Sequence, residues 1–180
     1  MVSLDGLARQ IAFSALVVAA TIAHAQVEDA AQIKNAVPVA SVEDKSVIYS
    51  ADDPAMTAAV EQARSTLSEF WAAFEAPADE VGRFSLKVAI REPDQEIVEH
   101  VWLGSLERKD DGTMVGTIDN QPNHLKSVAF GQHYRFSADQ ISDWMFYRHG
   151  KIVGGFTIRP ILQRLPPERA SAIRRMLETP

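Results

Sequence analysis

Apolar side chains recur at helical spacing between residues 56 and 74. The stretch opens with Asp53 and Pro54, an N-cap residue followed by a proline that suits the first helical position. Steps of four and three then separate the apolar residues, which are Met56, Val60, Ala63, Leu67, Phe70, Trp71 and Phe74. This spacing predicts one amphipathic helix that ends before Pro77, with Trp71 in the core.

The pattern changes to a period of two after residue 83. Phe84, Leu86, Val88 and Ile90 alternate with Ser85, Lys87, Ala89 and Arg91, which predicts a half-buried strand. A second extended run covers residues 97–106, and the turn signal at 110–112 leads to a returning strand at 114–118. We expect these two runs to pair antiparallel, with further strands at 134–136 and 144–147.

Helical spacing returns near the end of the chain. Gly154 and Gly155 allow a sharp backbone change, and apolar residues follow at positions 158, 161, 162 and 165. Pro166-Pro167-Glu168 ends this segment and opens another helix. The chain therefore predicts an α+β fold with an N-terminal amphipathic helix, a small antiparallel sheet of four to five strands and C-terminal helices.

The first 25 residues are typical of a signal peptide. Arg9 precedes an uncharged run at 11–23, and Ala23-His24-Ala25 offers small residues for cleavage after Ala25. The alternative, a membrane anchor, needs about 20 apolar residues, more than this run supplies. We therefore expect a periplasmic protein with no transmembrane span, an extended lead-in at 26–52 and one domain at 53–180.

Composition limits the classes of function. The chain is 46% hydrophobic and 23% charged, as in globular proteins, and it has no cysteine for a disulfide framework. Its net charge is −6, which disfavours nucleic-acid binding although arginines gather after residue 131. One alternative for this basic end is a structural envelope protein whose C-terminal helices touch anionic lipid.

Recognisable catalytic and metal-binding motifs are absent from the sequence. It has no Gly-x-Ser-x-Gly elbow and no phosphate-binding loop, and its histidines are too scattered for a zinc pair. We expect neither a metal nor a cofactor. His100 is the best candidate for a general acid or base, because it shares a strand face with Trp102 and a nearby carboxylate would tune its pKa.

Three segments carry a family resemblance. They are His100-Val101-Trp102, Asp119-Asn120-Gln121-Pro122, and Ile141-Ser142-Asp143-Trp144-Met145 followed by the stretch from Gly154 to Arg159. In this order they resemble the YegJ-like bacterial family, a domain of unknown function (DUF2314), over about residues 53–165. Phe156 stands where the family often has tyrosine. The resemblance implies a small α+β domain and brings no established catalytic residue.

Asp143 and Trp144 have two interpretations. In one, the Asp143 carboxylate caps backbone N–H groups at a structural corner and the indole packs in the core. In the other, they belong to a binding site with polar groups from Asp119, Asn120, Asp143 and Arg159 and apolar walls from Trp102 and Trp144.

Our preferred hypothesis is a non-catalytic periplasmic binding or interaction module, inhibitor-like or immunity-like, with a protein partner in the envelope. The alternative is an envelope hydrolase with His100 or Asp143 as general base. It requires His100, Asp119, Asp143 and Arg159 to converge on one concave pocket.

Overall fold

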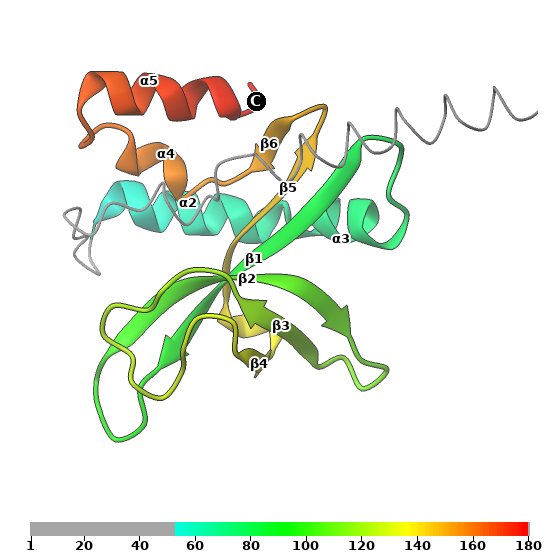
Figure 1. The fold of residues 1–180 in the computed structure, drawn as a ribbon, viewed down its shortest axis with the longest axis vertical. Helices are drawn as coiled ribbons and strands as arrows, with labels where there is room; N and C mark the ends of the chain where they lie inside the picture. The colour runs from blue at the N-terminus through cyan, green and yellow to red at the C-terminus, as the bar shows by residue number, and fades with distance from the viewer. Residues whose placement is uncertain (1–52, 180) are drawn as a thin grey trace, which may run out of the picture. The chain divides into compact units, whose positions relative to one another are not determined.

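The computed structural model describes residues 53–179, which form a mixed α+β domain (Figure 1). In this described part, two helices precede the sheet and two follow it, so the predicted fold class is confirmed. The expected signal peptide and lead-in lie outside the described residues. Among the helices of residues 53–179, none has the length and hydrophobicity needed to cross a bilayer.

The predicted first helix is two helices, α2 (Pro54–Ser65) and α3 (Leu67–Glu75). Asp53 caps α2 as expected, since its carboxylate accepts the Ala55 N–H at 2.9 Å. The expectation of one uninterrupted helix was wrong because the chain breaks at Thr66. The Thr66 hydroxyl donates to the Gln62 carbonyl at 2.9 Å, a local bond that competes with helical geometry.

Six antiparallel strands form the sheet in the order β4-β3-β2-β1-β5-β6. Their bounds are β1 Val81–Arg91, β2 Val98–Arg108, β3 Met114–Ile118, β4 His133–Phe136, β5 Ile141–Arg148 and β6 Lys151–Gly154. The sequence predicts four to five of them, and β6 is the short additional strand. The connection from β4 crosses the sheet, so that β1 lies between β2 and β5.

The predicted hairpin at 110–112 is present, and a second one joins β5 to β6. Arg108 pairs with Met114 around the turn that contains Gly112, and Arg148 pairs with Lys151 around His149 and Gly150. His149 and Gly150 both have positive φ, at 48° and 71°, as a two-residue turn between twisted strands requires.

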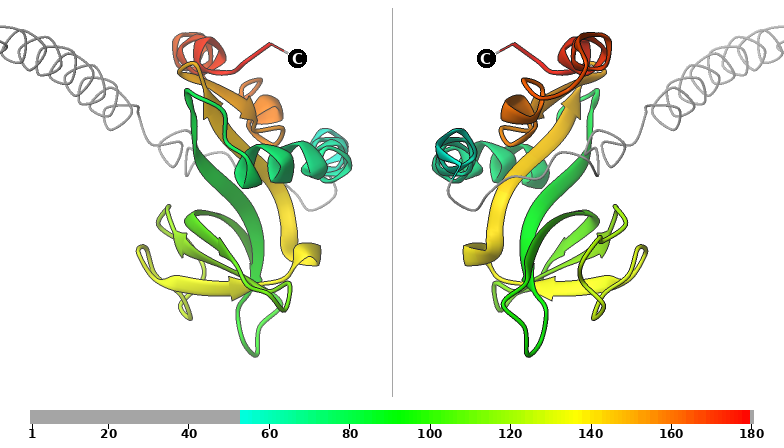
Figure 2. Two further views of the ribbon diagram at one scale, coloured as in Figure 1. Left: turned by 90° about the vertical axis from the view of Figure 1, so that its right-hand side faces the viewer. Right: turned by 90° about the vertical axis from the view of Figure 1, so that its left-hand side faces the viewer.

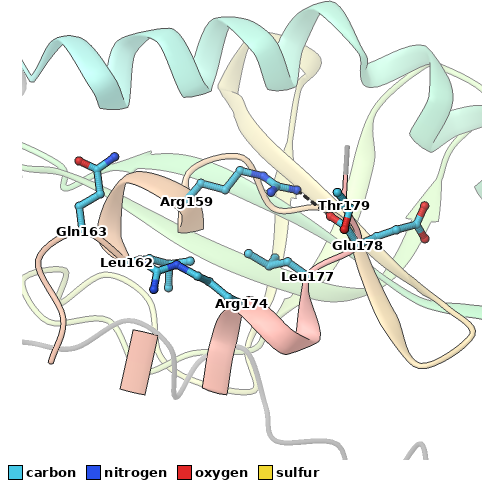
Figure 3. A pocket seen from close by; sticks show the side chains of 7 residues that line it. All are labelled: Arg159, Leu162, Gln163, Arg174, Leu177, Glu178 and Thr179. Atoms are coloured by element: carbon cyan, nitrogen blue, oxygen red, sulfur yellow. Dashed lines mark hydrogen bonds between the residues drawn. The ribbon is translucent and has the colours of Figure 1, made fainter. Parts of the chain in front are cut away.

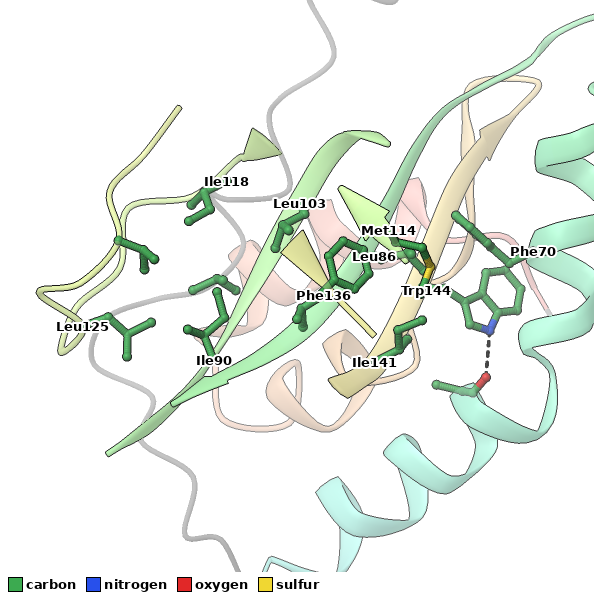
Figure 4. Close-up of a cluster of buried hydrophobic side chains, with 14 of the residues drawn as sticks. Phe70, Leu86, Ile90, Leu103, Met114, Ile118, Leu125, Phe136, Ile141 and Trp144 are labelled. Atoms are coloured by element: carbon green, nitrogen blue, oxygen red, sulfur yellow. Dashed lines mark hydrogen bonds between the residues drawn. The ribbon is translucent and has the colours of Figure 1, made fainter. Parts of the chain in front are cut away.

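The main core lies between one face of the sheet and helices α2 and α3 (Figures 2 and 4). Leu86, Leu103 and Trp144 lie on this face, and Phe70 of α3 packs against the Trp144 ring. The Trp144 Nε1–H donates to the Ala63 carbonyl of α2 at 2.8 Å. Trp71 was expected in the core but is only partly buried against it.

The chain end covers one edge of the sheet. After α4 (Ile158–Ile161) and α5 (Pro167–Met176), Leu177 forms a parallel bridge with Ile152 of β6. The Glu178 N–H donates to the Ile152 carbonyl at 2.8 Å. Pairing of this kind blocks strand addition at β6.

Gly154 is required where β6 turns past Trp144. Its φ is +81°, and an added Cβ would lie 2.6 Å from the Trp144 ring. We predict that Gly154→Ala lowers the free energy of unfolding by about 2–4 kcal/mol, because left-handed strain adds to a clash in the core. Urea denaturation measures the change. Gly82→Ala is the control, since nothing lies within 4 Å of its added Cβ, and an equal loss there would contradict the account.

Candidate functional site

The Asp143 carboxylate is fully buried and accepts four hydrogen bonds. The N–H groups of Trp144 (2.8 Å) and Phe156 (3.2 Å) donate to Oδ1, and the Thr157 N–H (2.7 Å) and hydroxyl (2.6 Å) donate to Oδ2. Burial raises the pKa of Asp143, against the opposing effects of the Thr157 hydrogen bonds and the Lys87 charge. Because both oxygens are occupied inside the fold, this group joins β5 to the turn after β6, as the structural-corner interpretation predicts.

Lys87 lies beside Asp143 and is also buried. It is opposite Trp102 on one side and Asp143 on the other. Its Nζ is 3.4 Å from the Thr157 hydroxyl and 5.5 Å from the centre of the Trp102 ring. The prediction of an exposed polar face on this strand was wrong for Lys87 and Ser85, because β1 is a central strand whose neighbours cover both residues.

His100 joins this polar face through a serine. Its Nδ1 is 2.8 Å from the Ser142 hydroxyl, which donates to the Lys87 carbonyl at 3.2 Å. The Ser142 hydroxyl therefore lies between the imidazole and the backbone of β1. His100 is thus connected to the backbone of β1 through Ser142.

Asn120 and Asp119 hold the start of the β3–β4 connection against β2. Asn120 Oδ1 accepts the Trp102 N–H at 2.7 Å, and the Asp119 N–H donates to the Trp102 carbonyl at 2.8 Å. Burial raises the pKa of the Asp119 carboxyl, and the charge of Arg83 opposes this. The Arg83 guanidinium also lies 4.8 Å from the centre of the Tyr147 ring. Asp119 is therefore grouped with Arg83 and Tyr147, whereas Asp143 contacts Thr157 and Lys87.

The predicted site residues do not form one pocket. Trp144 lies on the helix-covered face, whereas Asp143 and Trp102 belong to the opposite face. A terminal nitrogen of Arg159 donates to the Glu178 carbonyl at 3.2 Å, near the chain end. Within residues 53–179, His100, Asp119, Asp143 and Arg159 therefore have separate partners, and no cluster of three or more metal-binding side chains occurs.

Two glutamates that sequence reasoning missed hold the loop of residues 119–132. Glu99 accepts the N–H groups of Asn123 and His124 at 2.7 and 2.8 Å. Glu92 accepts the Lys126 N–H at 2.8 Å and the Ser127 hydroxyl at 2.9 Å. Carboxylates that bind backbone N–H groups order a loop that has no secondary structure of its own. Nothing in the local pattern distinguishes them from solvated acids.

This loop exposes the aromatic ring of Phe130 between residues that are held by core packing and hydrogen bonds. Phe130 is 61% exposed, while Leu125 and Val128 of the same loop enter the core. Next to Phe130, the Gly131 N–H donates to the Ile118 carbonyl at 2.8 Å and Gln132 Oε1 accepts the Ala129 N–H at 3.0 Å. The 119–132 loop is thus an ordered platform with an exposed apolar tip.

The loop should loosen in acid. Burial alone would raise the pKa of Glu92, but hydrogen bonds from Lys126 and Ser127 outweigh it and hold the pKa below the ordinary 4.5. A lowered pKa stabilises the fold above the unfolded-state value and loses this effect as pH falls through the folded-state value. We predict that the protection factors for amide exchange at Lys126 and Ser127 fall below about pH 4.5, and that Glu92→Gln lowers them already at neutral pH.

Glu96→Gln is the matched control, since Glu96 is exposed in the same β1–β2 turn. Exchange at Lys126 and Ser127 that is as slow in Glu92→Gln as in Glu96→Gln at neutral pH would contradict the role of Glu92.

Comparison with known proteins identifies the family. A family model described as "Uncharacterized protein conserved in bacteria (DUF2314)" matches residues 53–175. The chain is 33% identical over 136 residues to the uncharacterized protein YegJ of Escherichia coli, covering 76% of this chain and 86% of YegJ.

It is also 32% identical over 133 residues to a putative ankyrin repeat protein of Neisseria meningitidis serogroup B, covering 68% of this chain and 51% of that protein. No solved structure matches the chain. The matched segment runs from the start of α2 to the penultimate residue of α5, and the chain belongs to the YegJ-like DUF2314 family.

Proposed function

We propose that this domain is a non-catalytic binding module of the bacterial cell envelope that recognises a protein partner through the 119–132 loop. The observation that carries the proposal is the 61% exposure of Phe130 on a loop whose flanks are hydrogen-bonded to the sheet. Large aromatic side chains dominate the binding energy of many interfaces when they enter a pocket on the partner.

The order of the loop favours tight binding. Association is costly when a flexible segment must be immobilised, and a loop already held in place avoids much of that cost. Glu92 and Glu99 hold the stretch that precedes Phe130, and Ile118 holds the residue that follows it. The ring therefore needs little rearrangement to enter a complementary apolar pocket.

The same geometry gives less support to an envelope hydrolase. Both oxygens of Asp143 accept hydrogen bonds from the fold, and His100 lies on different contacts from Asp143, with its Nδ1 at the Ser142 hydroxyl. General acid–base chemistry needs a titratable group within reach of the substrate proton. A binding role fits these contacts because it does not require an accessible carboxylate, and Asp143 then has a structural role alone.

One relative adds independent support. It is named a putative ankyrin repeat protein, and about half of it matches this chain. Ankyrin repeats stack into extended surfaces that bind other molecules. A DUF2314 domain within such a protein is consistent with a role in interaction.

The proposed location follows from the predicted signal peptide, with cleavage after Ala25 and a periplasmic mature protein. An inhibitor-like or immunity-like activity would use the loop to block a protein in the same compartment. Cell fractionation followed by N-terminal sequencing tests this part, and a mature chain that retains residues 1–25 in the cytoplasm would contradict it.

We predict that Phe130→Ala weakens capture of the partner at least tenfold, because truncation removes an aromatic anchor (about 1.4 kcal/mol per tenfold). Quantitative cross-linking of the mature protein in its own periplasm identifies the partner, and titration with the purified partner measures the affinity. Val98→Ala is the control, since Val98 is 41% exposed on β2 outside the loop. Equal binding by Phe130→Ala and wild type would contradict the proposal.

A further inference from the structure

A hollow of about 310 Å³ lies between α4, α5 and the end of the chain (Figure 3). We call it the C-terminal hollow; its lining residues are Arg159, Leu162, Gln163, Arg174, Leu177, Glu178 and Thr179. Its volume is at the lower end of the range of small-molecule sites. It belongs neither to the 119–132 loop nor to the Asp143 contacts.

Arg159, which lines this hollow, carries an unsatisfied donor. One of its terminal nitrogens donates to the Glu178 carbonyl, but its Nε is buried and has no hydrogen-bond partner within the described part of the chain. Buried donors are nearly always paired, and an arginine stays charged at any physiological pH. The Nε of Arg159 therefore lacks an acceptor, and an anionic oxygen is the partner that a guanidinium N–H binds most strongly.

The charge of the C-terminal hollow is positive. Arg174 of α5 lines the same space as Arg159. The carboxylate of Glu178 is paired with Arg148, whose Nε lies 3.1 Å from Oε2, and this hydrogen bond lowers the pKa of Glu178. Because that negative charge is already matched by Arg148, it leaves Arg159 and Arg174 to attract an anion.

Apolar side chains form the remaining wall. Leu162 and Leu177 are both buried and line the hollow (Figure 3). The backbone bond from Glu178 to Ile152 keeps this wall in place. A ligand that satisfies both features carries an anionic head and a short apolar tail.

We infer that the C-terminal hollow binds a small organic anion, a carboxylate or phosphate monoester with a short apolar chain. Arg159 and Arg174 hold the anionic oxygens, and Leu162 and Leu177 contact the chain. This inference does not rest on the proposed partner-binding function, since the two use different residues.

Octanoate is a suitable probe, and isothermal titration of the mature protein measures its binding. We expect saturable binding at one site, at least tenfold weaker in Arg159→Gln and several-fold weaker in Arg174→Gln. Arg175→Gln is the matched control on α5, because Arg175 does not line the hollow, and it should bind as wild type does. Arg174 is exposed, so its variant tests the inference even if Arg159→Gln fails to fold.

Three further probes separate the contribution of the anionic head from that of the apolar tail. Octyl phosphate, which has both, should bind comparably to octanoate. Octanol lacks the anionic head and inorganic phosphate lacks the tail, so each should bind at least tenfold more weakly. Absence of saturable octanoate binding would overturn the inference, as would an equal loss in Arg175→Gln. Binding only to vesicles that contain anionic lipid, with none to octanoate, would overturn it in favour of a charged surface.

Discussion

The buried carboxylate of Asp143 is the interaction on which the rest of the domain depends. It fixes the turn after β6 to the middle of β5, and α4 starts directly after that turn. Through α4 and α5 the chain returns to cover β6, and the C-terminal hollow forms between these elements. On the opposite side of the same strand, Trp144 reaches α2, so adjacent residues of β5 hold both faces of the sheet.

Such an arrangement separates structural groups from exposed ones. Asp143 and Lys87 are ionisable residues that lie inside the domain. Loss of their hydrogen-bond partners there would lower the free energy of unfolding. Groups that remain available are peripheral: an aromatic ring on the 119–132 loop and arginines near the chain end. A stable centre with recognition groups at its margins is what a binding module requires.

Sequence reasoning predicts the elements whose signals are local. The Asp53 cap, the alternation in β1 and the turn around Gly112 each depend on neighbouring residues, and each appears where expected. The break at Thr66 comes from a side-chain bond to Gln62 that apolar spacing does not reveal, and the burial of Lys87 depends on tertiary packing. The link from Glu92 to Lys126 joins segments far apart in the chain, and a single sequence carries no signal of that contact.

The site shows the same division. Adjacent motif residues at 119–120 and 143–144 are all engaged in the fold, but alternation along a strand sends Asp143 and Trp144 to opposite faces, so they cannot share a pocket. The sequence predicts that Asp143 caps backbone N–H groups, but not that two of these groups come from Phe156 and Thr157 beyond the next strand. The separation of Arg159 from Asp143 could not be predicted either, because the direction of the chain after Gly155 sets it.

The most direct test of this account is the stability of Asp143→Asn, measured by urea denaturation with partner capture assayed on the folded protein. An amide places N–H groups against donors that need an acceptor, so the free energy of unfolding should fall by about 2–4 kcal/mol. Amide protection at Phe156 and Thr157 should fall with it, while the folded variant captures the partner as wild type does. Unchanged stability together with lost capture would contradict the structural role of Asp143 and place it in the functional site.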